Sequence, residues 1–382
     1  MKNILVISFS DLSIDPRVNR QLHTLSKNYH VFAAGYSFST LPKILGINIK
    51  PKFNNFMQSL QKFMNMLLRR FESVYWDYRM NDYFNHIKDS IATSYIDVIY
   101  ANDISSLPLA LKLKDVYNCK VIFDAHEYAP REWEDRFFWR IMHQPYVNYL
   151  CKKYIPKVDL FITVGDRIAK EYELQFNINK AHVILNAPGE QKALMPSIVG
   201  DSKIRMIHHG AAIRSRKIEL MIEMMDYLND DFSLDLMLVP VDQKYYKKLI
   251  KLASFKNINI IEPVSMQEIC KKINEYDIGV YILDQSKNFN HENALPNKLF
   301  EFIQAGLAIA IGPSYEMKSF VQKFDLGVVS DSFNSKDLAE ELMRLSKDDI
   351  VRFKSNAKKA ASVLNAENEG EKILALVEGL LT

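Results

Sequence analysis

The sequence predicts an α/β protein with two doubly wound domains in series, each built on a parallel sheet. Short, unalternating apolar runs recur along the chain, and each precedes a segment of helical periodicity, as buried parallel strands do. The length of 382 residues exceeds what one compact core usually supports, so two domains are expected. With 48% apolar and 25% charged residues, the composition is that of an ordinary globular protein.

The apolar runs give the expected strands in order. Those of the first half are Ile4 to Phe9, Val31 to Ala34, Val98 to Ala101, Lys120 to Phe123 and Leu160 to Val164. Those of the second half are Ile204 to His208, Leu234 to Val239, Ile258 to Ile261, Ile278 to Leu283, Ala308 to Ile311 and Gly327 to Val329. The pattern therefore predicts two similar Rossmann-like domains in series.

The domain boundary is predicted near residue 195. Periodicity stops in the polar, Gly- and Pro-marked stretch from Asn186 to Asp201. This gives an N-terminal domain over residues 1–195 and a C-terminal domain over residues 196–365. A helical pattern from Asp348 to Leu381, interrupted around Leu364 to Gly370, ends the chain. Its last part, residues 366–382, is a candidate for crossing back to the first domain.

Charge and cysteine content narrow the class of protein. A net charge of +3 is close to balance and no nucleic-acid reading motif is present, which argues against a nucleic-acid partner. Cys119, Cys151 and Cys270 lie far apart without metal-ligand spacing, which is typical of reduced, buried thiols in a cytosolic protein. No apolar stretch reaches the length of a membrane-spanning helix, so any membrane contact is expected to be peripheral.

Residues 50–72 form an amphipathic segment with a character of its own. Apolar residues recur there at helical spacing, with basic residues among them: Phe53, Phe56, Met57, Leu60, Phe63, Met64, Leu67, Leu68 and Phe71, and Lys50, Lys52, Lys62, Arg69 and Arg70. A helix lying in a membrane interface has this pattern, and so does an amphipathic helix packed on a core. Apolar periodicity usually means burial, which favours the second interpretation.

The first candidate site follows the first strand, because doubly wound domains bind ligands at the carboxyl ends of their strands. In the polar loop from Ser10 onward, Asp15 is the expected N-cap and Pro16 the first residue of a helix. Arg17 then lies at a helix N-terminus, where the dipole disfavours a cation unless an anion is close. Ser10, Asp15 and Arg17 are candidate phosphate or acceptor contacts, and the alternative for Arg17 is the solvated face.

A second candidate follows the strand that ends at Phe123, in the sequence Asp124-Ala-His126-Glu127. A histidine beside two carboxylates at a strand end can act as a hydrogen-bonding group near a reacting centre. His126 is therefore a candidate catalytic residue and Glu127 a candidate ligand contact. A purely structural role is the alternative for this histidine.

The second half holds a cationic candidate at Gly210, where a strand is expected to open into a helix. Glycine permits close backbone approach, and Arg214, Arg216 and Lys217 gather within four residues, which suits a diphosphate. A solvated helix start is the alternative.

A helix is predicted to begin at Pro296 and to end before Gly306. Asn297 and Glu301 lie one turn apart on it, and Glu301 is a carboxylate among apolar residues. Such a group is costly to bury unless it is hydrogen-bonded, and a ribose diol offers two donors. A local pair with Lys298 is the alternative.

Taken together, these segments resemble the GT-B glycosyltransferases, and among them the large retaining family 4. The resemblance covers essentially the whole chain and implies that the two Rossmann-like domains face a central cleft. It rests on Asp15-Pro-Arg-Val, Asp124-Ala-His-Glu, Gly210 to Lys217, and Pro296-Asn-Lys-Leu-Phe-Glu-Phe with Ala305-Gly306. Each motif alone is weak, whereas their order and spacing are specific.

The resemblance implies roles for these residues. Glu301 matches the second glutamate of the family's paired-glutamate motif, which binds the ribose hydroxyls of the donor. Arg216 or Lys217 matches the motif lysine, and Arg214 the nearby arginine, that neutralise the departing diphosphate. His126 is similar to the histidine near the reacting sugar carbon. The donor loop would comprise Asn293, Ala294, Leu295, Asn297 and Lys298, with Gly210 opposite the phosphates.

The chain departs from the family pattern at one position. The family's first glutamate lies eight residues before the second, where this chain has Asn293 with Glu292 beside it. Either the neighbour substitutes for the missing glutamate or an amide makes the contact. The first strand also lacks the two-glycine loop of many relatives.

The implied activity is retaining transfer of a hexosyl group from a nucleotide diphosphate donor, with UDP favoured by family frequency. The N-terminal domain would bind the acceptor, a hydroxyl of a glycan or lipid-linked glycan in bacterial-type surface polysaccharide synthesis. No metal or other cofactor is expected. The enzyme would be cytoplasmic, with peripheral contact at the inner face of the membrane. The alternatives are a nucleotide-sugar epimerase on the same fold and a catalytically degenerate nucleotide-sugar-binding relative.

Overall fold

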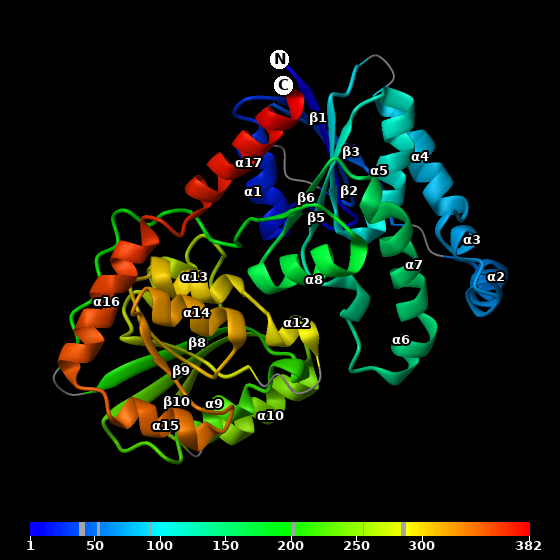
Figure 1. Cartoon of the computed structure of the whole chain (residues 1–382). Helices are drawn as coiled ribbons and strands as arrows, with labels where there is room; N and C mark the ends of the chain where they lie inside the picture. Colours follow the sequence, from blue (N-terminus) through cyan, green and yellow to red (C-terminus); the bar gives the residue numbers. More distant parts are fainter. Residues whose placement is uncertain (38–42, 52–53, 92–93, 201–202, 255, 284–287) are drawn as a thin grey trace. The chain divides into compact units, whose positions relative to one another are not determined.

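The computed structural model describes residues 1–37, 43–51, 54–91, 94–200, 203–254, 256–283 and 288–382 (Figure 1). They form two compact units. Unit 1 holds residues 1–184 together with 288–290 and 370–382, and unit 2 holds the described residues of 185–283 and 291–369. The predicted boundary near 195 falls inside unit 2, because the polar stretch is attached there: the Leu185 N–H donates to Glu369 and the Gln191 N–H to Gln304, each at 2.9 Å.

Unit 1 is built on a seven-stranded parallel sheet in the order β3-β2-β1-β4-β5-β6-β7. The strands are β1 (Asn3–Ile7), β2 (His30–Gly35), β3 (Ile44–Asn48), β4 (Val98–Asn102), β5 (Lys120–Ala125), β6 (Leu160–Thr163) and β7 (Ala181–Val183). The order reverses between β1 and β4, which is the switch point where doubly wound sheets bind ligands.

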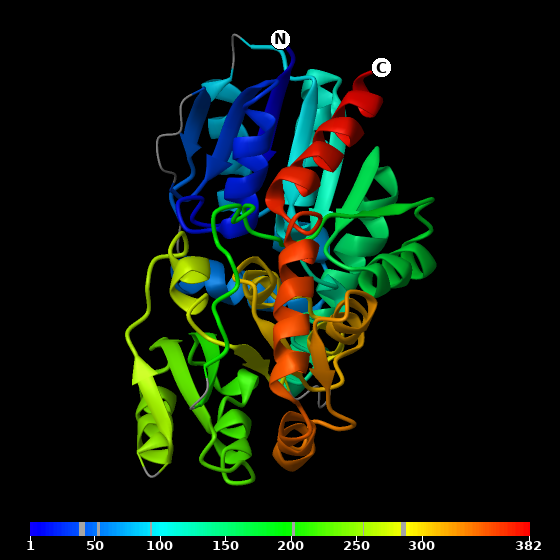
Figure 2. The same ribbon diagram turned by 90° about the vertical axis from the view of Figure 1, so that its left-hand side faces the viewer.

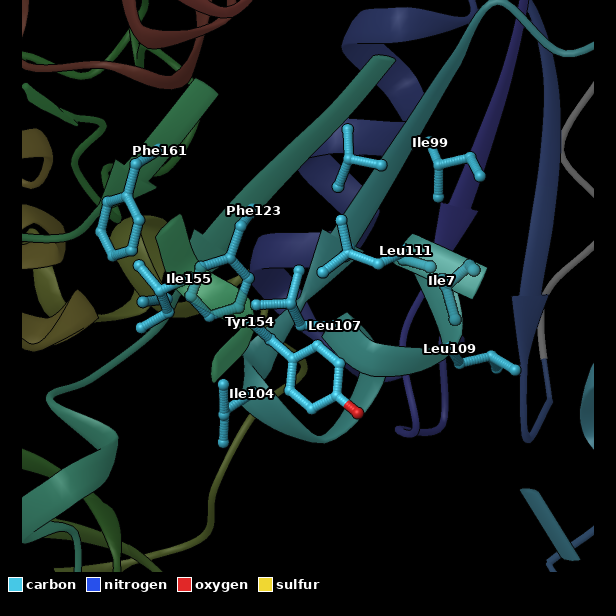
Figure 3. Packing of buried hydrophobic residues seen from close by; sticks show 14 of the residues in the cluster. Ile7, Ile99, Ile104, Leu107, Leu109, Leu111, Phe123, Tyr154, Ile155 and Phe161 are labelled. Atoms are coloured by element: carbon cyan, nitrogen blue, oxygen red, sulfur yellow. The ribbon is translucent and has the colours of Figure 1, made fainter. Parts of the chain in front are cut away.

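The helices of unit 1 are α1 (Pro16–Leu25), α2 (Phe56–Leu67), α3 (Phe71–Tyr75), α4 (Tyr78–Ser90), α5 (Asp103–Tyr117), α6 (Phe137–Met142), α7 (Gln144–Tyr154), α8 (Asp166–Phe176) and α17 (Ala366–Leu381), with 3-10 turns at Ala129–Arg131 and Ile155–Lys157. Helices such as α5 and α1 cover the two faces of this sheet, and further helices of unit 1 lie outside these layers. Figure 3 shows one side of the core, where Leu107 and Leu109 of α5 pack beside Ile99 and Phe123 of the sheet.

The C-terminal helix α17 completes the other face of the unit 1 sheet. Ile373 and Val377 are buried in one cluster with Val18 and Leu22 of α1 and Ile4 of β1. Figure 1 and Figure 2 both show α17 alongside α1. Residues 370–382 therefore belong to the core of unit 1 although they lie at the far end of the chain.

Unit 2 repeats the architecture with six parallel strands in the order β10-β9-β8-β11-β12-β13. The strands are β8 (Ile204–Ala211), β9 (Phe232–Val239), β10 (Ile258–Ile261), β11 (Ile278–Tyr281), β12 (Ala308–Ile311) and β13 (Gly327–Val329). The helices are α9 (Glu219–Met224), α10 (Gln243–Ala253), α11 (Ile269–Ile273), α13 (Asn297–Gln304), α14 (Tyr315–Lys323), α15 (Ser335–Met343) and α16 (Lys347–Ala361). Unit 2 also contains the 3-10 turn η3 (Arg214–Arg216), and the short helix α12 (Phe289–Glu292) is divided after Asn290 between unit 1 and unit 2.

Every predicted apolar run lies in a strand, and the predicted fold class of two Rossmann-like parallel-sheet domains is confirmed. Two edge strands, β3 and β7, were not predicted. Most residues of β3 are exposed or half-buried and β7 has three residues, so neither produces the apolar run of a central strand. The predicted break in the C-terminal helix lies between α16 and α17.

Helix α2 contradicts the burial interpretation of residues 50–72. Its one buried residue is Met66, and its other apolar residues are exposed. Lys52 and Phe53 lie outside the described residues. Among the described helices, none combines the length and apolar character needed to span a bilayer. All three cysteines are buried and free of disulfides.

Candidate functional site

Unit 1 places His126 directly after β5, where it meets the end of the adjacent strand β4. Its Nε2 lies 3.0 Å from Asn102 Oδ1 and its Nδ1 lies 3.2 Å from Asp103 Oδ2. The His126 backbone N–H also donates to Asp103 Oδ1 at 3.2 Å. Both ring nitrogens therefore face oxygen atoms, which fix the ring at the carboxyl edge of the sheet next to the switch point.

Asp103 adopts a backbone conformation that is unusual for a residue with a side chain. Its φ is 61°, at the junction of β4 and α5. Left-handed backbone conformations of this kind cost of the order of 1 kcal/mol or more and cluster at functional sites. Asp103 therefore places its carboxylate against His126 at the cost of backbone strain. This strain favours a functional interpretation of the His126–Asp103 pair.

Two neighbouring carboxyl groups lie beyond His126. Burial, together with the negative charge of Glu132, raises the pKa of Glu127 to about 9. Burial also raises the pKa of Glu132. Close carboxylates cannot both ionise readily, so the pair holds one proton at neutral pH and the neutral Glu127 donates to Glu132. This gives unit 1 a protonated carboxylic acid next to a histidine.

Replacing Glu127 with glutamine should change how stability depends on pH. The folded-state pKa of Glu127 lies above the unfolded value, so its contribution favours folding at acidic pH and is lost as pH rises toward 9. Glutamine keeps a neutral donor at every pH. Between about pH 5 and about pH 8 the variant should therefore gain about 4 kcal/mol of stability relative to wild type, measured by urea unfolding. Glu378→Gln, an exposed position on α17, is the control. A difference that does not vary with pH would show that Glu127 is ionised.

The buried position of Arg17 rules out its predicted solvated alternative, and its anionic partner within the chain is Asp124. The guanidinium is buried and makes a bidentate pair with Asp124, with Nη2 to Oδ1 at 2.7 Å and Nε to Oδ2 at 3.1 Å. It also donates to the carbonyl of Ile184 at 2.9 Å. Gln21 and Tyr100 donate to the same carboxylate. This network joins α1 to β5 and makes Arg17 structural.

Ser10 and Asp15 are engaged with each other at the start of α1. Asp15 is the N-cap and accepts from the backbone N–H groups of Arg17 and Val18, each at 3.1 Å, as predicted. Ser10 Oγ donates to the other Asp15 oxygen at 2.8 Å. Their contacts to phosphate or acceptor stay predictions.

Unit 2 brings two cations together over Gly210. This glycine near the end of β8 has a φ of 133°, and a Cβ placed there would lie 3.2 Å from Arg216 Nη1 and 3.4 Å from Lys298 Nζ. A side chain at position 210 would therefore push against both cations. Glycine leaves the space in which an anionic group could meet Arg216, Lys298 and the backbone.

Lys298 is a buried cation beside neutral groups. It comes from the first turn of α13, and its residue is 5% exposed. Its Nζ lies 3.2 Å from His208 Nε2 and 3.9 Å from the ring centre of Tyr281. Because the carbonyl of Val280 can only accept, His208 Nδ1 carries the hydrogen and Nε2 accepts from Lys298. Burial first, and then the charge of Arg216, lower the pKa of Lys298 well below its usual value.

Glu301 lies one turn further along α13, next to the second histidine of β8. Its Oε2 is 3.4 Å from His209 Nε2. Burial and the nearby cations lower the pKa of His209 to about 3, so the ring is neutral and the contact is not an ion pair. His209 Nε2 has no hydrogen-bond partner within the described chain. The Glu301 carboxylate therefore lies beside an unsatisfied ring nitrogen.

The three cations predicted after β8 do not act together. Arg214 turns to Asp242, with Nε to Oδ2 at 2.9 Å, and its side chain is 66% exposed. Arg216 faces Gly210 and Lys298 instead. Lys217 ends the 3-10 turn with a φ of 43°. The expected helix entrance is thus the 3-10 turn η3, since α9 begins only at Glu219.

The predicted donor loop has the expected form. Asn293, Ala294 and Leu295 lie between α12 and α13, and both Asn293 and Leu295 are buried. Helix α13 starts at Asn297 after Pro296, and Gly306 follows its end with a φ of 68°, as predicted. Whether Asn293 or Glu292 replaces the missing glutamate stays open to experiment.

Four residues that lie around His126 in unit 1 or around Lys298 in unit 2 were not identified from the sequence. Asn102, Asp103 and Glu132 belong with His126, and His208 belongs with Lys298. Asn102 and Asp103 directly follow a predicted strand, so the rule that singled out His126 also points to them. Glu132 and His208 carried no such signal, because their roles depend on contacts outside their own segments.

Solved structures share this fold. A sucrose-phosphate synthase from Thermosynechococcus elongatus matches with a TM-score of 0.77 and 12% identity, covering 100% of this chain and 99% of that one. The HepE protein of Anabaena in complex with UDP matches at 0.70 and 12%, covering 99% and 100%. A glycosyltransferase from Rickettsia africae matches at 0.69 and 14%, covering 100% and 99%. The chain therefore has the fold of GT-B glycosyltransferases.

Comparisons by sequence give no such match. No protein-family model matches the chain, and no curated protein matches it. At 10–14% identity the likeness to solved structures establishes the fold alone.

Proposed function

We propose that the chain is a glycosyltransferase that moves a hexosyl group, with retention of configuration, from a UDP-sugar to a hydroxyl of a glycan or lipid-linked glycan. The observation that carries the proposal is the pair of Arg216 and Lys298 over Gly210 at the end of β8. A diphosphate placed there would give the buried Lys298 the negative partner that His208 and Tyr281 do not provide.

Each unit contributes a separate function in this proposal. In unit 2, Arg216 and Lys298 neutralise the charge that builds on the leaving diphosphate, while Glu301 accepts hydrogen bonds from the ribose diol. In unit 1, His126 contacts the donor sugar near its reacting carbon, held by Asn102 and Asp103. In this proposal the diphosphate that leaves the donor helps to deprotonate the acceptor hydroxyl, and no metal ion is needed. Transfer is therefore expected to persist in the presence of EDTA.

Three features support a UDP-sugar over other anionic ligands. The resemblance extends across both halves of the chain, HepE shares the fold, and that neighbour was solved in complex with UDP. Glu301 also lies in the same helix as Lys298, three residues away, so phosphate and ribose contacts arise from neighbouring turns. The surface-polysaccharide pathway and the cytoplasmic location at the membrane face belong to the proposal through the same resemblance.

A thermal-shift screen with nucleotides and nucleotide-sugars tests the donor, because a ligand that binds the folded state raises its melting temperature. UDP or a UDP-sugar should give the largest shift. Glu301→Ala should raise the dissociation constant of UDP about tenfold or more, through the lost charged hydrogen bonds. His126→Ala should lower kcat more than it changes donor binding. If neither variant differs from wild type, the assignment of both residues fails.

A nucleotide-sugar epimerase is the second candidate, and the Glu127–Glu132 pair is the observation that favours it. An epimerase needs carboxyl groups near the sugar for acid and base steps, and this pair holds a proton next to His126. Incubation with UDP-sugars and no acceptor separates the two activities. An epimerase would convert the UDP-sugar to its epimer. A glycosyltransferase without acceptor would only release UDP slowly. A protein that binds the donor but shows no turnover with any acceptor would be a degenerate relative.

A further inference from the structure

The apolar face of α2 points away from the unit to which the helix belongs. Phe56 is 81% exposed and Phe63 52%, and the same face carries Met57, Leu60, Met64 and Leu67, which are all exposed. In Figure 1 the helix lies at the outer edge of unit 1, beyond α3. The helix is well defined by its sequence, since Asn55 and Gln58 form a capping box at its start.

The polar face of the same helix is turned inward. Gln58, Gln61, Lys62 and Asn65 line a cavity of about 480 Å³ together with Glu72, Trp76 and Asp77 of unit 1. Lys62 Nζ lies 3.7 Å from an Asp77 carboxylate oxygen. Surface helices of soluble domains face the other way, with apolar residues on the core and polar residues in water. The orientation of α2 is therefore inverted, which leaves a contiguous apolar surface exposed.

Helix α6, a neighbour of α2, also carries exposed apolar residues. Phe138 is 79% exposed, and Phe137 and Ile141 are also exposed. The two helices are neighbours, because Met66 of α2 and Met142 of α6 pack on one small cluster around Phe71 and Val74. We refer to the exposed apolar residues of α2 and α6, with Leu68 after α2, as the α2-α6 surface.

Basic residues border the α2-α6 surface. Arg69 and Arg70 follow α2 and are exposed. Arg136 precedes α6 and stacks on Trp133 at 4.0 Å, and Arg140 lies 5.9 Å from the Phe137 ring. Neither α2 nor α6 contains an acidic residue, although Glu134 and Asp135 precede α6. Apolar side chains flanked by arginines and aromatic rings suit a surface with an apolar interior and negatively charged head groups.

We propose that the α2-α6 surface docks unit 1 on an anionic lipid bilayer, with the apolar side chains in the interface and the arginines against lipid phosphates. A second copy of the chain fits less well, because a two-fold contact would bring two identical arginine-bordered surfaces together, and neither α2 nor α6 has an acidic residue to pair with the arginines. The inference deepens the membrane location proposed above. Membrane docking is argued from this surface and not from the transfer reaction. An experiment can therefore contradict one of the two proposals without contradicting the other.

Vesicle flotation tests the proposal with the whole chain. Wild type should bind vesicles of phosphatidylcholine with phosphatidylglycerol more than tenfold better than vesicles of phosphatidylcholine alone, and high salt should weaken the binding. The double variant Phe63→Ser/Leu67→Ser should lose at least tenfold in binding to the anionic vesicles. Val116→Ser/Leu174→Ser, at exposed apolar positions on α5 and α8, is the matched control and should bind as wild type. Arg69→Glu/Arg70→Glu should remove the preference for anionic lipid.

The controls make each result decisive. The substituted side chains are exposed, so far-UV circular dichroism and the melting-temperature shift with UDP should match wild type in all three variants. The proposal is overturned if wild type fails to bind vesicles, or if the control pair loses binding equally. It is also overturned if Phe63→Ser/Leu67→Ser converts a dimer to a monomer in gel filtration while vesicle binding is absent. In that case a second copy covers the surface.

Discussion

Replacing Lys298 with methionine is expected to weaken UDP binding by about a hundredfold while leaving the free protein at least as stable as wild type. The reason is that Lys298 is buried beside a neutral histidine and an aromatic ring, so its charge costs free energy until an anion arrives. Methionine retains the length and apolar stem of lysine without the charge. Calorimetry with UDP and urea unfolding without ligand measure the two effects.

Lys354 provides the matched control in the same unit. It is also buried, but its Nζ lies 3.3 Å from Asp277 and donates to the Tyr276 carbonyl at 2.8 Å. Lys354→Met leaves Asp277 without this cation and should lower the free energy of unfolding by about 3 kcal/mol without changing UDP affinity in the folded protein. If the two variants behave alike, Lys298 is an ordinary structural lysine and the diphosphate site is misplaced.

Donor binding should also move a proton. Burial and Arg216 lower the pKa of Lys298 in the free protein, and a bound diphosphate would raise it again. UDP binding at mildly alkaline pH is therefore expected to take up protons. The observed binding enthalpy would then depend on the ionisation enthalpy of the buffer, and Lys298→Met should abolish that dependence. A binding enthalpy independent of buffer would mean that Lys298 does not change its protonation.

The fold could be predicted from the sequence because central parallel strands are buried on both faces. Runs such as Val98 to Ala101 and Ala308 to Ile311 therefore contain only apolar residues, and their positions follow directly. Strand β3 lies at a sheet edge, with most of its residues partly or fully exposed, and gave no comparable signal. The same physical rule explains why helix α13 was predicted with both its ends: Pro296 and Gly306 have conformations that mark helix boundaries.

The candidate site was predicted only in part, because the partner of a polar residue lies elsewhere in the sequence. Arg17 and Asp124 are 107 positions apart, so sequence alone could not show that they form a buried pair. Arg214 and Arg216 are two residues apart in the 3-10 turn, yet Arg214 contacts Asp242 whereas Arg216 lies against Gly210. For α2, the periodicity predicted an apolar and a polar face. It could not show that the polar face lies toward the rest of unit 1, because that orientation depends on Glu72 and Asp77, which line the same cavity.

Removing one member of the Arg17–Asp124 pair is expected to destabilise unit 1 by about 3–5 kcal/mol. The side chain of Asp124 is completely buried and accepts from Arg17, Gln21 and Tyr100. Asp124→Ala removes the carboxylate that pairs with the buried Arg17 guanidinium, and Arg17→Ala leaves the carboxylate buried without its cation. Urea unfolding followed by tryptophan fluorescence suits the measurement, since all three tryptophans lie in unit 1.

The double variant Arg17→Met/Asp124→Leu separates a structural pair from a ligand contact. Replacing a buried ion pair by apolar residues of similar volume is often neutral, so the double variant should be more stable than either single variant. Because the pair joins α1 to β5 within unit 1, UDP binding should also survive in the double variant. If Arg17→Ala instead retained full stability and lost turnover, Arg17 would be the anion contact that its place at the start of α1 first suggested, and the pair with Asp124 would be secondary.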